Sequence, residues 1–109
     1  WQGCNSLTDF PANMFDNWSP PSLNDQVFNQ AWSLCPSLTP QSVENILVSI
    51  DTSGVHGTNT GASGGTQLAD HTIDIDYNAS AGGLTTATTT AITNLKNKDW
   101  AISINSVIQ

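Results

Sequence analysis

The sequence has few charged residues and almost no basic ones. Only 10% of its 109 residues are charged, against about 25% in an average globular protein. There is no arginine, the only lysines are Lys96 and Lys98, and the formal net charge is −7 at pH 7. Proteins bind phosphate backbones and anionic lipid surfaces through clustered Lys and Arg. The composition therefore argues against nucleic acid and anionic membranes as partners.

Long apolar runs are also missing. No stretch approaches the ~20 apolar residues of a membrane-spanning helix, and no secretory signal peptide is recognisable, so we expect no membrane insertion. Polarity comes mainly from Ser, Thr, Asn, Gln and Gly. This composition is typical of secreted, viral and cell-surface proteins, and it predicts an extracellular, virion or cell-surface location.

The usual motifs of catalysis are absent as well. The two cysteines lie 31 residues apart without the paired spacing of a zinc site. The histidines, His56 and His71, are accompanied by no Gly-x-Ser-x-Gly elbow, and Gly64-Gly65 lacks the Lys of a phosphate-binding loop. We therefore predict no enzymatic activity, no catalytic residues and no cofactor.

A sequence repeat is the strongest signal that is present. Residues 1–8, WQGCNSLT, return as residues 32–39, WSLCPSLT, with five identities in eight positions at an offset of 31. A fixed period of roughly 20–50 residues indicates a stacked repeat protein. In such a stack Trp1 and Trp32 should share the core, and Leu7 and Leu38 should be buried and in line. Since the chain begins within the motif, we expect further repeats N-terminal to Trp1 in a longer parent chain.

The two cysteines occupy equivalent positions of this repeat. Adjacent coils of a stack lie about 5 Å apart, which is within the range of Cα separations that a disulfide allows. Cys4 and Cys35 could therefore form a disulfide, or they could be two reduced thiols that pack as small hydrophobic side chains.

Hydrophobic periodicity predicts helices at 22–35, 40–52 and 85–97. The second is the best defined, because Thr39 is a good N-cap, Pro40 suits the first helical position and Gly54 can end the helix. Strict alternation predicts strands at 72–77 and 100–105, which should be parallel because a helix connects them. Residues 53–69 read as a long exposed loop.

The repeat resembles that of BspA-like leucine-rich-repeat proteins: Trp-x-x-Cys-x-Ser-Leu-Thr is followed by Phe10-Pro11. Residues 42–54 and 95–105 resemble the closing segment of such proteins in bacteriophage and bacterial surface chains. The chain departs from a simple repeat after Cys35, where Pro36 and Pro40 intervene, and in the strand at 72–77. The resemblance implies a curved solenoid with one short parallel strand per coil and a role in adhesion or host recognition.

Together these observations predict an α/β fold. Residues 1–54 would form two leucine-rich-repeat-like coils, and residues 55–109 a Gly-rich loop and a strand-helix-strand cap. In this cap Ile73, Ile75, Ile102 and Ile104 would face inward, and Asp74, Asp76, Ser103 and Asn105 would form a polar edge that discourages strand addition. Replacing Asp74 and Asp76 by Val should then promote self-association without changing the fold.

Three further places could bind something. Asp70, Asp74 and Asp76 form a weak candidate for a cation site, although a solvated strand face explains them as well. Trp18 is the tryptophan expected to be exposed, and it could contact a ligand. Asn78-Ala79-Ser80 is a glycosylation sequon, which matters only in a eukaryotic secretory setting.

The function that this reading favours is non-enzymatic: the end of a repeat array on a surface or virion, used for adhesion or host recognition. Its partner would be a protein or glycan on a cell surface, or other virion proteins. The alternative is a structural decoration protein of a phage capsid or tail, and a polysaccharide-active enzyme ranks third.

Overall fold

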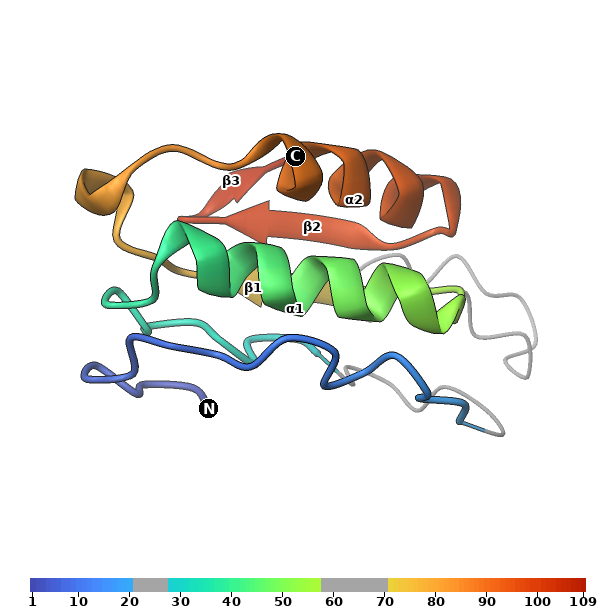
Figure 1. Cartoon of the computed structure of the whole chain (residues 1–109), viewed down its shortest axis with the longest axis horizontal. Coiled ribbons are helices and arrows are strands. Elements are labelled where there is room, and N and C mark those ends of the chain that lie inside the picture. Colours follow the sequence, from blue (N-terminus) through green and yellow to red (C-terminus); the bar gives the residue numbers. More distant parts are fainter. Residues whose placement is uncertain (21–27, 58–70) are drawn as a thin grey trace.

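Two α-helices lie side by side against a small sheet in the computed structural model, which describes residues 1–20, 28–57 and 71–109 (Figure 1). Helix α1 is Pro40–Ser53 and α2 is Thr86–Asn97, and the strands are β1 (Thr72–Ile75), β2 (Ala101–Ile104) and β3 (Val107–Ile108). A short 3-10 helix, η2, spans Ala79–Ala81. The protein is a small compact α/β domain, which confirms the predicted class.

Helix α1 follows the signals in its sequence closely. The Thr39 side chain accepts a hydrogen bond from the backbone N–H of Ser42, Pro40 occupies the first turn, and Gly54 ends the helix in the left-handed conformation with φ 74°. The apolar side chains at i, i+3, i+4 and i+7 are all fully buried: Val43, Ile46, Leu47 and Ile50. The predicted helix at 40–52 is confirmed with a one-residue extension.

Helix α2 forms although it is rich in threonine, which has poor helix propensity. Thr85 is its N-cap and accepts a hydrogen bond from the N–H of Thr88. One face carries buried side chains at the same i, i+3, i+4, i+7 spacing, namely Thr88, Ala91, Ile92 and Leu95. Packing of this face against α1 and the sheet outweighs the weak propensity, and the predicted helix at 85–97 is confirmed.

The sheet has the order β1-β2-β3. β1 and β2 are parallel with Ile73 opposite Ile102 and Ile75 opposite Ile104, as predicted, although both strands are shorter than expected. β3 pairs antiparallel with β2. The hairpin between them turns through Asn105 and Ser106, both with positive φ (48° and 65°). This is the backbone that a two-residue type I′ hairpin requires, and the sequence analysis did not predict this strand.

The predicted helix at 22–35 is wrong where the structure describes it, from residue 28 onward. Trp32 forms a parallel bridge to Ile75. Its N–H donates to the Asp74 carbonyl at 3.1 Å, and its own carbonyl accepts from the Asp76 N–H at 3.1 Å. These backbone groups are therefore used between segments, which a helix does not allow. Residues 22–27, and most of the loop predicted at 53–69, lie outside the described residues.

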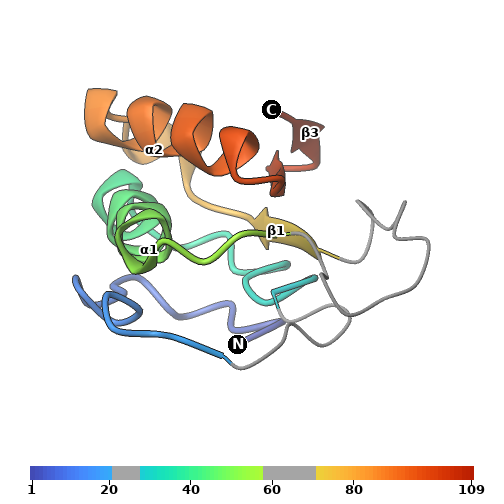
Figure 2. The same cartoon turned by 90° about the vertical axis from the view of Figure 1, so that its right-hand side faces the viewer.

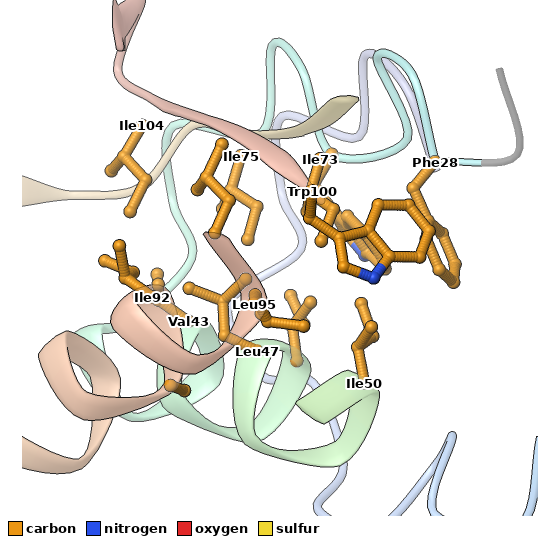
Figure 3. Close-up of a cluster of buried hydrophobic side chains, with 14 of the residues drawn as sticks. Phe28, Val43, Leu47, Ile50, Ile73, Ile75, Ile92, Leu95, Trp100 and Ile104 are labelled. Carbon is orange, nitrogen blue, oxygen red and sulfur yellow. The ribbon is translucent and has the colours of Figure 1, made fainter. Parts of the chain in front are cut away.

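Buried side chains from both predicted parts of the chain, 1–54 and 55–109, form one cluster, to which the helices, the sheet and the N-terminal segments all contribute. Figure 3 shows how α1 and α2 direct side chains toward the strand residues Ile73, Ile75 and Ile104. Figure 2 shows the helices on one side and the strands on the other, with the N-terminal segment beneath α1. Within the described ranges, neither helix is long and apolar enough to cross a membrane.

Glu44 connects the two helices through a polar contact. The Thr85 hydroxyl donates to Glu44 Oε1 at 2.7 Å, and Gln41 Nε2 donates to Oε2 at 2.5 Å. The hydrogen bond from Thr85 is the main reason, and that from Gln41 the second, why the pKa of Glu44 is lowered.

A lowered carboxyl pKa means that Glu44 stabilises the fold above the ordinary Glu pKa of about 4.3, and that this contribution is lost as pH falls below that value. Glu44→Gln should therefore be less stable than the wild type at pH 7, by a small amount because the group is partly solvated. In urea titrations the difference in stability should shrink toward zero as the pH falls to about 3, because the carboxyl becomes protonated below its reference pKa. An equal difference at both pH values would contradict this role.

Candidate functional site

The two copies of the sequence repeat lie side by side. The Gly3 N–H donates to the Ser33 carbonyl at 2.9 Å, and the Thr39 N–H donates to the Thr8 carbonyl at 3.0 Å. Between these bonds the Ser37 hydroxyl donates to the Asn5 carbonyl at 2.6 Å. Positions that are equivalent in sequence are thus neighbours in space along the length of the motif.

The two copies also share their backbone conformation. The N–H of Leu7 donates to the Cys4 carbonyl at 3.1 Å, and that of Leu38 donates to the Cys35 carbonyl at 3.2 Å. Gly3 has φ 76°, and its counterpart Leu34 has φ 58°. A left-handed φ is uncommon outside glycine, so its recurrence at the same repeat position indicates one turn built twice.

Four residues continue this alignment across the whole domain. The rings of Trp1 and Trp32 stack with centroids 5.6 Å apart and planes inclined by 6°. Trp32 pairs with Ile75, and Ile75 pairs with Ile104. We call Trp1, Trp32, Ile75 and Ile104 the central row. It joins the N-terminal segment, the 32–39 segment, β1 and β2 in chain order.

Trp1 is the exposed end of the central row. Trp1 is 54% exposed, whereas Trp32 is fully buried. One face of the Trp1 ring lies on Trp32, and Phe10 makes an edge contact with it at 5.2 Å and 84°. More than half of Trp1 nevertheless remains exposed among the described residues. The sequence placed Trp1 in the core, and the structure instead places it at the surface, stacked on the buried Trp32.

At the other repeat positions too, the residue of the second copy is more deeply buried than its counterpart in the first copy. Leu38 and Cys35 are fully buried, whereas Leu7 and Cys4 are half-buried and pack against the core. The second copy therefore lies between the first copy and β1, and the first copy forms one edge of the domain.

Trp18, expected to be the exposed tryptophan, is half-buried. Its ring contacts Phe28 at 5.1 Å and Trp100 at 6.4 Å, and Trp100 is itself buried. Trp18 thus covers the aromatic part of the core, and Trp1 offers the more accessible ring.

Asp74 and Asp76 do not form the free polar edge that the sequence predicted. Asp74 Oδ2 accepts the backbone N–H of Gln30 at 2.9 Å, and Asp76 Oδ2 accepts that of Leu34 at 2.7 Å. β1 has neighbours on both sides, so its acidic face holds the 30–34 segment in place. Asp70 lies outside the described residues, and within the described ones no group of three metal-ligating side chains is assembled.

Asp76→Ala should destabilise the domain by about 1–2 kcal/mol, because it removes a charge-assisted hydrogen bond to the strained turn at Leu34. Asp76→Asn keeps an acceptor oxygen and should cost less. Chemical denaturation of both variants measures the difference. The double replacement by Val should likewise lower stability, in place of the self-association expected from the sequence. Equal stability of Asp76→Ala and wild type would show that the contact is unimportant.

The histidines do not assemble a catalytic group among the described residues. His56 and Asp99 are both exposed, and His56 Nδ1 lies 3.9 Å from Asp99 Oδ2. Asp51, which precedes His56 in sequence, is instead engaged by Lys98 Nζ and by the Asn94 amide. His71 is buried with its ring against Trp100.

The sequon residue Asn78 has a structural contact of its own. It is exposed, and its side-chain oxygen accepts the N–H of Ser80 at 3.1 Å. Asn78 is thus the N-cap of η2. Its backbone N–H donates to the Leu38 carbonyl at 2.8 Å. The segment at residue 78 is thus hydrogen-bonded to the 32–39 segment, just as Thr39 is hydrogen-bonded to Thr8.

One related signal was missed in the sequence. Leu84-Thr85 precedes α2 as Leu38-Thr39 precedes α1, and both threonines are N-caps with a hydroxyl residue three positions later. A search for Leu-Thr-x-x-Ser/Thr finds both helix starts.

Comparisons with protein families, with curated proteins and with solved structures each find no match for this chain. The geometry of the described residues therefore carries the functional argument.

Proposed function

We propose that this chain is the end unit of a non-enzymatic repeat array that serves adhesion or host recognition on a cell surface or virion. The central row is the observation that carries the proposal. Four chain segments, taken in chain order, each place one residue beside a residue of the next segment, through backbone pairing or ring stacking. Segments that align in chain order, with helices on one side, are what a leucine-rich-repeat solenoid consists of.

The two ends of the central row differ, which supports the assignment of an end unit. Beyond Ile104, β2 is paired with the antiparallel strand β3, and an antiparallel strand interrupts the parallel order of the preceding segments. At the other end Trp1 is 54% exposed within the described residues, although its ring stacks on the equivalent Trp32. We infer that a further repeat would stack its own tryptophan on Trp1.

Extending the chain tests this proposal. A second copy of residues 1–31 is inserted ahead of Trp1, so that the counterpart of Trp1 in the added copy falls 31 residues before Trp1. If the unit stacks, the extended chain should have a higher Tm than the original, because stacked repeats gain stability from each interface. The average quenching of each tryptophan by acrylamide should also be weaker, since the added copy covers Trp1.

The matched control carries serine at the two positions of the added copy that correspond to Trp1 and Leu7. It has the same length and nearly the same composition, yet it lacks the side chains that would pack against Trp1 and Leu7. Only the repeat-bearing extension should raise the Tm. If both extensions leave the Tm unchanged and a protease trims both back to Trp1, the segment does not act as a stacking unit.

Copy number separates recognition from the alternative role in decoration. A decoration protein covers a capsid or tail lattice in many copies, whereas a recognition protein is present in a few copies at a fibre tip or cell surface. Quantitative mass spectrometry of purified particles or envelopes measures this directly. A lattice stoichiometry would favour the structural role, in which the repeats only provide rigidity.

A further inference from the structure

The repeat brings the two cysteines of the chain together. The Trp1 carbonyl oxygen accepts the Cys4 N–H at 3.2 Å and the Cys35 thiol at 3.0 Å. One oxygen thus contacts both residues. The neighbouring backbone bond from Gly3 to Ser33, 2.9 Å long, holds the two segments together at this point. Segments paired in this way lie about 5 Å apart, within the Cα separations of about 4.4–6.8 Å found in disulfides.

The two thiols have different surroundings. Cys35 is fully buried and Cys4 is half-buried, and neither is in a disulfide in this structure. Burial raises the pKa of the Cys35 thiol, and the backbone N–H of Cys4 acts in the opposite direction. Cys4 is therefore the thiol that a reagent in solution reaches first, and Cys35 is placed to react second.

We propose that Cys4 and Cys35 are a cross-linking site, at which oxidation by a small-molecule disulfide covalently joins the two repeat copies. The Cys4 thiolate attacks one sulfur of the small disulfide, forms a mixed disulfide and releases one thiol. The Cys35 thiolate then attacks the Cys4 sulfur, forms the Cys4–Cys35 bond and releases the second thiol. The protein loses two protons and two electrons, and the small disulfide gains them.

The cross-link would fasten the edge segment of the domain. Residues 1–8 are hydrogen-bonded to residues 32–39, which lie between them and β1. A bond across 31 residues restricts the unfolded chain, and it holds Trp1 on Trp32. The proposed bond depends only on the contacts between the two copies, and it can form whether or not further repeats precede Trp1.

The test equilibrates the folded wild-type chain with oxidised glutathione, blocks remaining thiols with N-ethylmaleimide and measures the intact mass. The oxidised chain should take up no maleimide and carry no glutathione, and a chymotryptic digest should contain a peptide pair linked through Cys4 and Cys35. The Tm should be higher than that of the reduced protein by about 10 °C, and dithiothreitol should reverse the change.

The single variants Cys4→Ser and Cys35→Ser are the controls, since neither can form the intramolecular bond. Their Tm should not respond to glutathione in the way that the wild type does. A wild-type chain that keeps two free thiols overturns the proposal. So does one that stops at glutathionylated Cys4, or that forms only intermolecular dimers. These results leave the extension experiment unaffected, because stacking does not require the bond.

Discussion

Replacing Trp32 by alanine should destabilise the domain by about 3–5 kcal/mol. This is the largest loss of stability that we expect from a single substitution. Trp32 is fully buried, and its ring contacts those of Trp1, Phe10, Phe15 and Phe28. A domain of this size has a total stability of about 5–15 kcal/mol. Urea denaturation followed by far-UV circular dichroism should therefore show Trp32→Ala as marginally folded or unfolded.

Trp32→Phe separates loss of the aromatic ring from loss of the indole N–H. The Trp32 Nε1 atom is buried and has no hydrogen-bond partner among the described residues. Phenylalanine thus removes part of the ring and no described hydrogen bond, and it should cost clearly less than alanine. If Trp32→Phe is as damaging as Trp32→Ala, the indole N–H has a role that the aromatic cluster does not explain.

The second large effect is expected on the inner face of α1. Leu47→Ala should cost about 2–5 kcal/mol, the usual range for truncation of a buried leucine. Leu47 is fully buried between the helices and the sheet (Figure 3). The loss should appear as a lower urea midpoint with an unchanged denaturant slope.

The adjacent residue provides the control for this experiment. Val48 lies on the same helix and is 36% exposed, so Val48→Ala should cost well under about 1 kcal/mol. Both variants change helix propensity only slightly. If the two variants are equally stable, or if Leu47→Ala costs less than about 0.5 kcal/mol, α1 is peripheral to the stability of the fold.

Local signals explain why the helices were predictable. In α1 the N-cap, the first-turn proline and the C-terminal glycine all lie within a few residues of the helix they delimit, at Thr39, Pro40 and Gly54. In α2 the buried face from Thr88 to Leu95 repeats the spacing seen in α1. The strand alternation at 72–75 also predicted which side chains face the core, because that pattern needs no knowledge of the partner.

The incorrect predictions all depended on partners distant in sequence. The spacing of Phe28, Ala31, Trp32 and Cys35 suits a helix, yet Trp32 pairs with β1 and its aromatic neighbours come from several segments. The alternation at Asp74 and Asp76 gave their side of the strand correctly, but it could not show that backbone N–H groups from 30–34 occupy that side.

Only part of the candidate site could be predicted from the sequence. The repeat identified Trp1, Trp32, Cys4 and Cys35 as equivalent pairs, and the structure places these pairs next to one another. The role of Ile75 and Ile104 in the same row could not be read, because isoleucine replaces tryptophan at those positions and the spacing from 32 to 75 exceeds the period.

The proposed function depends on the contacts along the central row, and NMR measures these contacts most directly. In the folded chain with selectively labelled Trp and Ile, nuclear Overhauser effects should connect Trp1 with Trp32, Trp32 with Ile75 and Ile75 with Ile104. Trp1 and Ile75 should show no direct effect, because Trp32 lies between them. The absence of the Trp1–Trp32 contact, together with free rotation of the Trp1 ring, would contradict the stacking of the two repeat copies.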